Sequence, residues 1–169
     1  MTGPLAVFIG PMGAGKTRIG KRVAKALGVP FTDTDKVIVA RHGVIADIFD
    51  QHGEPHFRAL EREVVHEALQ GEGVVSLGGG AVLDEASRAE LRELPVVYLT
   101  ISAEAVESRL GDGKRPLARG GVADWQRIFD ARRSVYEELA RVTFDTSRLP
   151  IEQIARDVVA WIENDGRES

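Results

Sequence analysis

The sequence predicts an α/β fold in which a parallel sheet is covered by helices on both faces. Five short apolar runs alternate with longer amphipathic stretches, and these runs lie at residues 5–9, 30–32, 74–77, 96–101 and 142–144. Such alternation is typical of βαβ units, whose right-handed crossovers place helices on the two faces of a sheet. A glycine-rich pattern that suits phosphate follows the first run directly. Ligands in this architecture bind beyond the carboxyl ends of the strands, so we expect the site there.

The chain of 169 residues is the length of one domain, and we treat residues 1–169 as a single domain with one site. Its composition, 43% hydrophobic and 28% charged, is that of an ordinary globular protein. Cysteine is absent, which excludes disulfides and zinc–thiolate chemistry. We expect a cytoplasmic monomer, because no leader pattern, long apolar run or exposed apolar stripe is evident.

The charge of the chain bears on its partners. A net charge of −4 argues against nucleic acid, because a phosphate backbone requires a broad positive surface. Residues 109–141 reverse this balance locally, with eight basic residues against five acidic ones. This stretch suits an anionic ligand, and a solvated helix face rich in arginine is the alternative.

Helical stretches separate the apolar runs. Gly28 follows the helical pattern of residues 19–27 as a C-terminal stop. In residues 53–69 the apolar positions recur at helical spacing, which places Arg58, Glu61 and Arg62 nearer the flank of that helix. Further helices are predicted at residues 36–41, 103–110 and 151–162.

Residues 111–122 contain four glycines around an Arg-Pro-Leu sequence and are predicted to form a mobile lid. Trp125 and Trp161 are interpreted as packing residues on helix faces. None of the four histidines has the neighbours of a metal ligand in the sequence, and we assign them no chemistry.

Residues 10–17 read Gly-Pro-Met-Gly-Ala-Gly-Lys-Thr and match the P-loop pattern G-x-x-x-x-G-K-[ST] between a strand and a helix. The glycines permit backbone torsions that turn N–H groups toward phosphate at the positive end of a helix. Lys16 is expected to reach the β and γ phosphates, and Thr17 to offer its hydroxyl to Mg²⁺. The alternative is a glycine-rich turn without a ligand. A P-loop identifies a bound nucleotide and leaves the reaction open.

Two carboxylates follow the second apolar run. Strand alternation would point Asp33 and Asp35 to the same side, near the P-loop. One could hold Mg²⁺ through water, and Asp35 could orient an attacking hydroxyl and take its proton late in the transfer. The alternative is a pair of helix-capping aspartates.

The third apolar run ends in three glycines, Gly78, Gly79 and Gly80, which would let a ligand lie against backbone. A tight strand exit is the alternative. Arg58 and Arg132 lie in predicted helices, and two arginines would select an acidic substrate because a guanidinium grips a carboxylate with two hydrogen bonds. Taken singly, each arginine also fits a surface position over apolar neighbours.

Together these motifs resemble the shikimate kinase family over nearly the whole chain. The resemblance is carried by GPMGAGKT at 10–17, DTD at 33–35, GE-x-x-FR at 53–58, SLGGGA at 76–81, RPL at 115–117 and Arg-x-x-x-Tyr at 132–136. It implies ATP and shikimate as substrates, Mg²⁺ as the cofactor and the fold of the nucleoside monophosphate kinases. That fold has three layers, a five-stranded parallel sheet of order 2-3-1-4-5, a mobile lid and an acceptor-binding helical region, here at about residues 33–62.

The resemblance also implies site residues. Phe49 and Phe57 would form an apolar wall, and Arg109 would stack on adenine beside the turn at residues 146–148. The catalytic residues would be Asp35, Lys16 and Arg115, the last as the lid arginine. ATP would be held by Gly13, Ala14, Gly15, Lys16, Thr17, Arg18, Arg109, Arg115 and Arg148. Shikimate would be held by Asp35, Arg58, Gly78, Gly79, Gly80 and Arg132, and the metal by Thr17 and Asp33.

The sequence departs from the family at one point. The family commonly reads R-x-P-L-Y in the Arg132 region, whereas here Ser134 replaces the proline and Arg133 follows Arg132. We favour Arg132 for the carboxylate because of its spacing to Tyr136. The rival functions are a kinase for gluconate or a nucleoside monophosphate, and a nucleotide-dependent switch. The three-glycine strand exit and the two arginines argue against the first, and a missing guanine-reading N-K-x-D segment argues against the second.

Overall fold

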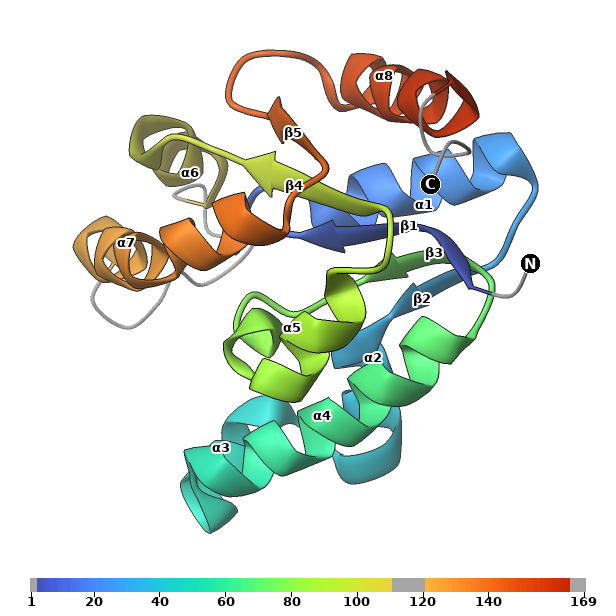
Figure 1. Ribbon diagram of the computed structural model, residues 1–169. Coiled ribbons are helices and arrows are strands. Elements are labelled where there is room, and N and C mark those ends of the chain that lie inside the picture. The colour runs from blue at the N-terminus through green and yellow to red at the C-terminus, as the bar shows by residue number, and fades with distance from the viewer. Residues whose placement is uncertain (1–2, 111–120, 165–169) are drawn as a thin grey trace.

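The structure, a computed structural model, describes residues 3–110 and 121–164. Five parallel strands form one sheet of order β2-β3-β1-β4-β5, which confirms the expected topology. Figure 1 shows the sheet running through the middle of the molecule. The strands are β1 (Pro4–Ile9), β2 (Phe31–Asp33), β3 (Gly73–Ser76), β4 (Val96–Thr100) and β5 (Val142–Asp145).

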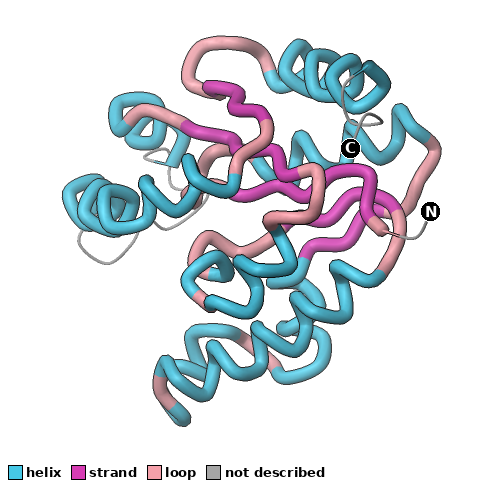
Figure 2. The backbone as a smooth tube through the Cα atoms, in the orientation of Figure 1, coloured by secondary structure: helices cyan, strands magenta, loops and turns pink. Residues whose placement is uncertain are grey.

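Helices lie on both sides of this sheet, as the tube in Figure 2 shows. Helices α1 and α8 pack together on one face, and α4 and α5 lie on the other (Figure 1). Helices α2 and α3 pack against α4. The helices are α1 (Lys16–Leu27), α2 (Thr34–His42), α3 (Ile45–His52), α4 (Glu54–Gln70), the 3₁₀ turn η1 (Ala81–Leu83), α5 (Glu85–Leu91), α6 (Ala103–Leu110), α7 (Gly121–Leu139) and α8 (Ile151–Asn164).

The core is divided by the sheet, because alternate residues of a strand point to opposite faces. Phe8 of β1 packs with α1 and α8, whereas its neighbours Val7 and Ile9 pack with α4, α5 and the end of α7. A third apolar cluster, including Ile38, Ile48, Phe57 and Val64, joins α2, α3 and α4.

The central strand directs the site to one edge of the sheet. Phe8 is paired with Ser76 of β3 on one side and with Val97 of β4 on the other. The carboxyl ends of β1 and β3 therefore lie side by side, with Asp33 of β2 paired to Ser76 beyond them. The P-loop, the glycine exit and the acidic pair all begin at this edge.

Several expectations need correction. Strand β2 ends at Asp33, so Asp35 lies in the first turn of α2 and not on the strand. Helices α3 and α5 were not predicted, because each is short and lacks a long apolar period. Glu61 is 4% exposed and is buried within α4 rather than placed at its flank. The expected lid at 111–122 falls outside the described residues except for its last two, which begin α7.

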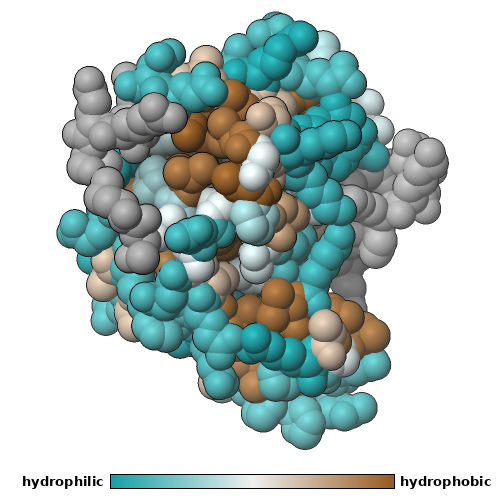
Figure 3. All heavy atoms as spheres, turned by 90° about the vertical axis from the view of Figure 1, so that its right-hand side faces the viewer, coloured by the Kyte–Doolittle hydropathy of each residue, from teal (hydrophilic) through white to brown (hydrophobic). Residues whose placement is uncertain are grey.

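The surface and the helices bear on the expected partners. On the face in Figure 3, hydrophobic residues gather in two areas separated by hydrophilic ones. Across residues 3–110 and 121–164, no helix combines the length and the apolar character needed to cross a bilayer.

Candidate active site

The P-loop has the backbone geometry that its glycines predict. Gly10, Gly13 and Gly15 have φ values of 143°, 88° and 93°, which favour glycine over other residues. A Cβ atom on Gly10 would lie 2.1 Å from the carbonyl oxygen of Leu99 in β4, so only glycine lets the loop leave the sheet there. Gly15 is the N-cap of α1 and has no capping side chain, which leaves the N–H groups of the first turn free for a ligand.

Lys16 folds over this loop. Its Nζ donates hydrogen bonds to the carbonyl oxygens of Gly10, at 2.6 Å, and Pro11, at 3.1 Å. Burial lowers the pKa of Lys16 to about 8, although the nearby carboxylates of Asp35 and Asp33 act to raise it. The ammonium is therefore held at the loop and is still mostly protonated at neutral pH.

The P-loop and the acidic pair are joined through Asp33. Thr17 donates from Oγ1 to Oδ2 of Asp33 at 2.8 Å. The other carboxylate oxygen accepts from the backbone N–H groups of Asp35, at 3.0 Å, and Lys36, at 3.3 Å. Asp33 is thus the N-cap of α2, which confirms the capping interpretation, and it is also the partner of Thr17.

Asp35 is not a cap and points its carboxylate toward the glycine exit. A Cβ atom on Gly78 would lie 2.6 Å from Oδ1 of Asp35, so the absence of a side chain at Gly78 makes room for this carboxylate. Burial raises the pKa of Asp35, as does the neighbouring charge of Asp33, while Lys16 and Arg58 act in the opposite direction. A half-buried carboxylate with a raised pKa is a suitable proton acceptor.

These residues border a cavity of about 340 Å³ at the carboxyl edge of the sheet. Its wall comes from the P-loop, the acidic pair, the exit of β3 and helix α7. The lining residues are Pro11, Met12, Gly13, Gly15, Lys16, Thr17, Arg18, Asp33, Asp35, Ser76, Leu77, Gly79, Trp125, Ile128, Phe129, Arg132 and Tyr136. The structure therefore brings most of the predicted residues around one space.

Arg58 lies beside this cavity, over the glycine exit. A Cβ atom on Gly80 would come within 2.5 Å of its Nη2 atom, so the guanidinium lies against the Gly80 backbone. Nη1 donates to the buried carboxylate of Glu61 at 2.7 Å, and the guanidinium carbon lies 5.2 Å from the centre of the Phe57 ring. Burial raises the pKa of Glu61, which Arg58 opposes. Phe57 in turn contacts Phe49, with ring centres 4.8 Å apart.

Arg132 approaches the same exit from α7. A Cβ atom on Gly79 would lie 3.3 Å from its Nη1 atom. One turn along α7, Tyr136 is fully buried and donates from its hydroxyl to the Gly79 carbonyl oxygen at 2.6 Å. Burial raises the pKa of Tyr136 to about 12, so this hydroxyl keeps its proton. Arg133 points elsewhere and forms an exposed pair with Glu137 at 3.0 Å.

Only some of the residues predicted to bind the adenine side of ATP lie near the P-loop. Arg109 of α6 donates to the carbonyl oxygen of Thr146, and it also reaches Gly13 of the P-loop at 3.4 Å. Arg148 is exposed and does not line the cavity, although it follows Thr146 closely in the chain. Ala14 is buried beneath the loop, and Arg18 is exposed at its rim. Arg115 lies outside the described residues.

Three residues make contacts at the site that the sequence did not predict. Trp125 packs in the apolar core as expected, and in addition it lines the cavity and donates from Nε1 to the Met12 carbonyl oxygen at 2.8 Å. No local pattern indicates that contact, which spans more than a hundred residues. Glu61 could have been found, because it shares the apolar stripe of Phe57 and Val65 at helical spacing. Tyr136 was used only as a motif residue.

A P-loop, a carboxylate pair and two arginines beside the glycine exit lie at one sheet edge, an arrangement typical of a P-loop kinase for a small acceptor. The family model described as Shikimate kinase matches residues 12–163. The chain therefore belongs to the shikimate kinase family.

Individual relatives agree with this assignment. A shikimate kinase from Streptomyces avermitilis is 43% identical over 167 residues, which cover 96% of this chain and 98% of that protein. One from Thermobifida fusca is 47% identical over 156 residues, covering 90% and 91%. The solved structure of shikimate kinase from Acinetobacter baumannii in complex with shikimate superimposes with a TM-score of 0.84 at 28% identity, covering 100% of this chain and 97% of that one.

Proposed function

We propose that the protein transfers the γ-phosphoryl group of ATP to the 3-hydroxyl of shikimate, giving shikimate 3-phosphate and ADP. Besides the family membership, one structural observation supports this choice of acceptor. Two arginines from different helices, Arg58 and Arg132, lie against the consecutive glycines Gly80 and Gly79, next to the P-loop edge. This arrangement suits a small acceptor that carries a carboxylate, which shikimate does.

On the acceptor side, Arg58 and Arg132 would hold the shikimate carboxylate, since paired guanidinium groups give strong charge-assisted hydrogen bonds. Glu61 would orient Arg58, because their ion pair of 2.7 Å fixes the guanidinium from within α4. The backbone at Gly78, Gly79 and Gly80 would lie against the ring of the acceptor. Asp35 would accept a hydrogen bond from the attacking hydroxyl and take its proton late, which a loose phosphoryl-transfer transition state permits.

On the donor side, the P-loop N–H groups from Gly13 to Thr17 would surround the phosphates, and the Lys16 ammonium would exchange its contacts with Gly10 and Pro11 for phosphate oxygens. Arg109 would flank the adenine. Arg18, at the rim of the cavity, and Arg148, outside it, would complete the ATP-binding residues. Arg115, in the segment that the resemblance marks as a lid, would place its charge over the transferring phosphoryl group, and Arg115→Ala is expected to abolish turnover.

Mg²⁺ fits the residues present at the phosphate end. Thr17 and Asp33 supply a hydroxyl and a carboxylate 2.8 Å apart, and oxygen donors of this kind suit Mg²⁺. Among residues 3–110 and 121–164, no group of three acidic or histidine side chains could hold a metal alone. That agrees with an ion bound mainly by ATP phosphates and water, with Thr17 as a direct ligand and Asp33 acting through water. When bound, Mg²⁺ would offset negative charge on the phosphates.

The test is an ADP-release assay with MgATP and three acceptors: shikimate, gluconate and AMP. We expect ADP formation with shikimate and far less with the other two, because AMP has no carboxylate and gluconate carries its carboxylate on an open chain rather than on a ring. ADP release that does not depend on shikimate would overturn the acceptor assignment and leave the nucleotide site intact. Release with no acceptor at all would favour a nucleotide-hydrolysing switch.

We further propose that the chain acts as a single domain and a monomer on these small molecules in the cytoplasm. On the face in Figure 3 the two hydrophobic areas are separated by hydrophilic residues, so this face offers no continuous apolar patch to a second copy of the chain. Sedimentation equilibrium at micromolar concentration tests it.

A further inference from the structure

One side of α4 carries three basic residues at intervals of four. Arg58, Arg62 and His66 lie on successive turns, because residues four apart share a helix face. All three face the segment from Gly80 to Glu90, which contains η1 and α5. Arg58 lies on Gly80 at the start of this segment, and His66 contacts Glu90 at its end.

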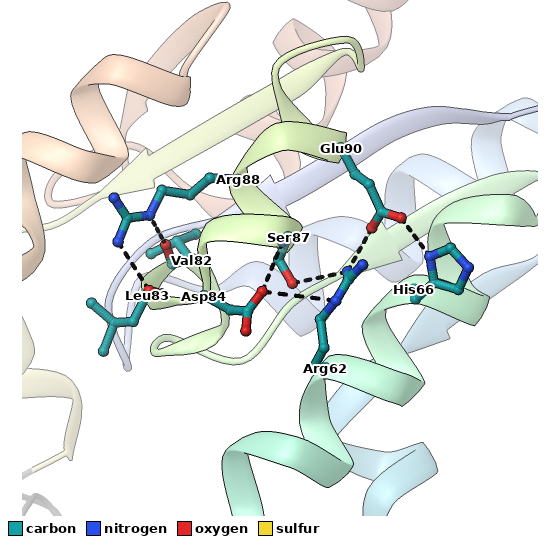
Figure 4. Close-up of polar contacts among 8 residues, drawn as sticks. All are labelled: Arg62, His66, Val82, Leu83, Asp84, Ser87, Arg88 and Glu90. Atoms are coloured by element: carbon teal, nitrogen blue, oxygen red, sulfur yellow. Dashed lines mark hydrogen bonds and ion pairs between the residues drawn. The ribbon is translucent and has the colours of Figure 1, made fainter. Parts of the chain in front are cut away.

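Arg62 is the central contact of this row. Its Nη1 donates to Oε2 of Glu90 at 2.7 Å and to Oγ of Ser87 at 3.2 Å, and its Nε lies 3.7 Å from Oδ1 of Asp84. Figure 4 shows the guanidinium reaching from α4 to these three side chains. The Arg62 side chain is 27% exposed and that of Glu90 is 24% exposed, so water screens this pair less than a surface pair.

The segment that receives Arg62 is itself held together. Asp84 caps α5 by accepting from the Ser87 N–H at 2.9 Å. Arg88 donates to the carbonyl oxygens of Val82, at 2.8 Å, and Leu83, at 2.9 Å, which closes η1 against α5 (Figure 4). Hydrogen bonds thus connect α5 to η1, and η1 in turn to Gly80, whose carbonyl oxygen accepts from the Leu83 N–H at 3.1 Å.

The other polar partners of Arg58 do not supply this connection. Glu61 and Glu54 both lie on α4, so they orient the guanidinium relative to its own helix only. The apolar contacts of α4 with the sheet come from Val65 and Leu69, farther along the helix, whereas Phe57 packs toward α2 and α3. Arg62 is the ion-pairing residue one turn from Arg58 that reaches across to α5.

We propose that Arg62 is a positioning residue for the acceptor site: by tying α4 to α5 it sets the distance between the Arg58 guanidinium and the glycine exit. The inference rests on the proposed function, in which Arg58 holds the carboxylate of shikimate. Arg62 does not line the cavity at the sheet edge. Its removal would let the first half of α4 move away from the exit, which would weaken acceptor binding and leave the P-loop unaffected.

The test is steady-state kinetics of Arg62→Ala against Arg92→Ala. Arg92, the C-cap of α5, makes a more exposed ion pair with Glu138 of α7 at 3.0 Å, away from α4. For Arg62→Ala we expect the KM for shikimate to rise about tenfold, equivalent to about 1.4 kcal/mol, with kcat and the KM for ATP within about twofold of wild type. Arg62→Lys should raise the KM for shikimate less than Arg62→Ala does, since lysine keeps the positive charge but lacks the branched guanidinium that contacts several partners. Arg92→Ala should match wild type.

An unchanged shikimate KM in a folded Arg62→Ala protein would overturn the inference, as would an equal rise in both Michaelis constants. If Arg62→Ala does not fold, Glu90→Gln decides by the same criterion, because it removes the charge of the partner and keeps its shape. A wild-type protein without shikimate-dependent activity would instead refute the proposed function, so the two failures are distinguishable.

Discussion

The hydroxyl of Thr17 donates to a carboxylate oxygen of Asp33 at 2.8 Å, while the second oxygen of the same carboxylate caps α2. This side chain therefore connects the end of the P-loop with the helix that carries Asp35. In the proposed active site the donor and acceptor sides therefore meet in one residue, and we expect a change at Asp33 to affect both.

We expect Asp33→Asn to raise the Mg²⁺ concentration needed for half-maximal rate by about tenfold, because the amide keeps the cap but removes the negative charge that would orient metal-bound water. Thermal unfolding should change little, since Asn is as good an N-cap as Asp. Thr17→Ser is the matched control, because it keeps the hydroxyl. A wild-type Mg²⁺ dependence in Asp33→Asn would exclude Asp33 from the metal site.

The lowered pKa of Lys16 predicts a pH dependence for ATP. The protonated ammonium binds phosphate, so kcat/KM for ATP should fall as pH rises through about 8, the pKa of Lys16 in the free protein. The slope should approach about tenfold per pH unit for loss of one proton. A profile measured with saturating shikimate checks this. A flat profile to well above pH 8 would show that another group carries the phosphate contact.

Arg132 and Arg133 offer a direct comparison, since they are adjacent and only Arg132 lines the cavity. Arg132→Ala should raise the KM for shikimate by roughly 30-fold or more, as expected for loss of a charge-assisted contact of about 2 kcal/mol. Arg133→Ala should stay within about twofold, because its ion pair with Glu137 is exposed. The reverse result would transfer the carboxylate contact to Arg133.

Gly80→Ala tests the close approach of Arg58. Gly80 has a φ of −95°, which alanine adopts without strain, but the added Cβ would lie 2.5 Å from Nη2 of Arg58 and would displace the guanidinium. We expect a higher KM for shikimate with nearly unchanged unfolding. Gly71→Ala is the control, because Gly71 has a φ of −82°, and its nearest atom, 3.4 Å from an added Cβ, is an ordinary contact far from the site. If both variants bind shikimate as wild type does, Arg58 can adapt and the close approach has no function.

By itself, the sequence determined the parts of this protein that depend on short stretches of backbone. The P-loop torsions, the alternation of strands and helices, and the start of α6 at Ala103 follow from glycines, apolar periods and caps that act within a few residues. The parallel sheet follows from the same alternation, and its strand order was available through the family resemblance. The boundary of β2 and the two short helices α3 and α5 were missed, because brief elements are stabilised by their tertiary neighbours more than by their own pattern.

Only the tertiary structure decided which side chains meet. Arg132 and Arg133 are adjacent residues of the same type. The orientation of α7 places Arg132 at the cavity and Arg133 in solvent. Glu61 became a buried partner of Arg58, and Trp125 a partner of Met12, through packing between helices and loops far apart in the chain. The lowered pKa of Lys16 likewise requires the fold. Burial lowers this pKa and the carboxylates of Asp35 and Asp33 counteract the change, and both effects depend on distances in space that the sequence does not contain.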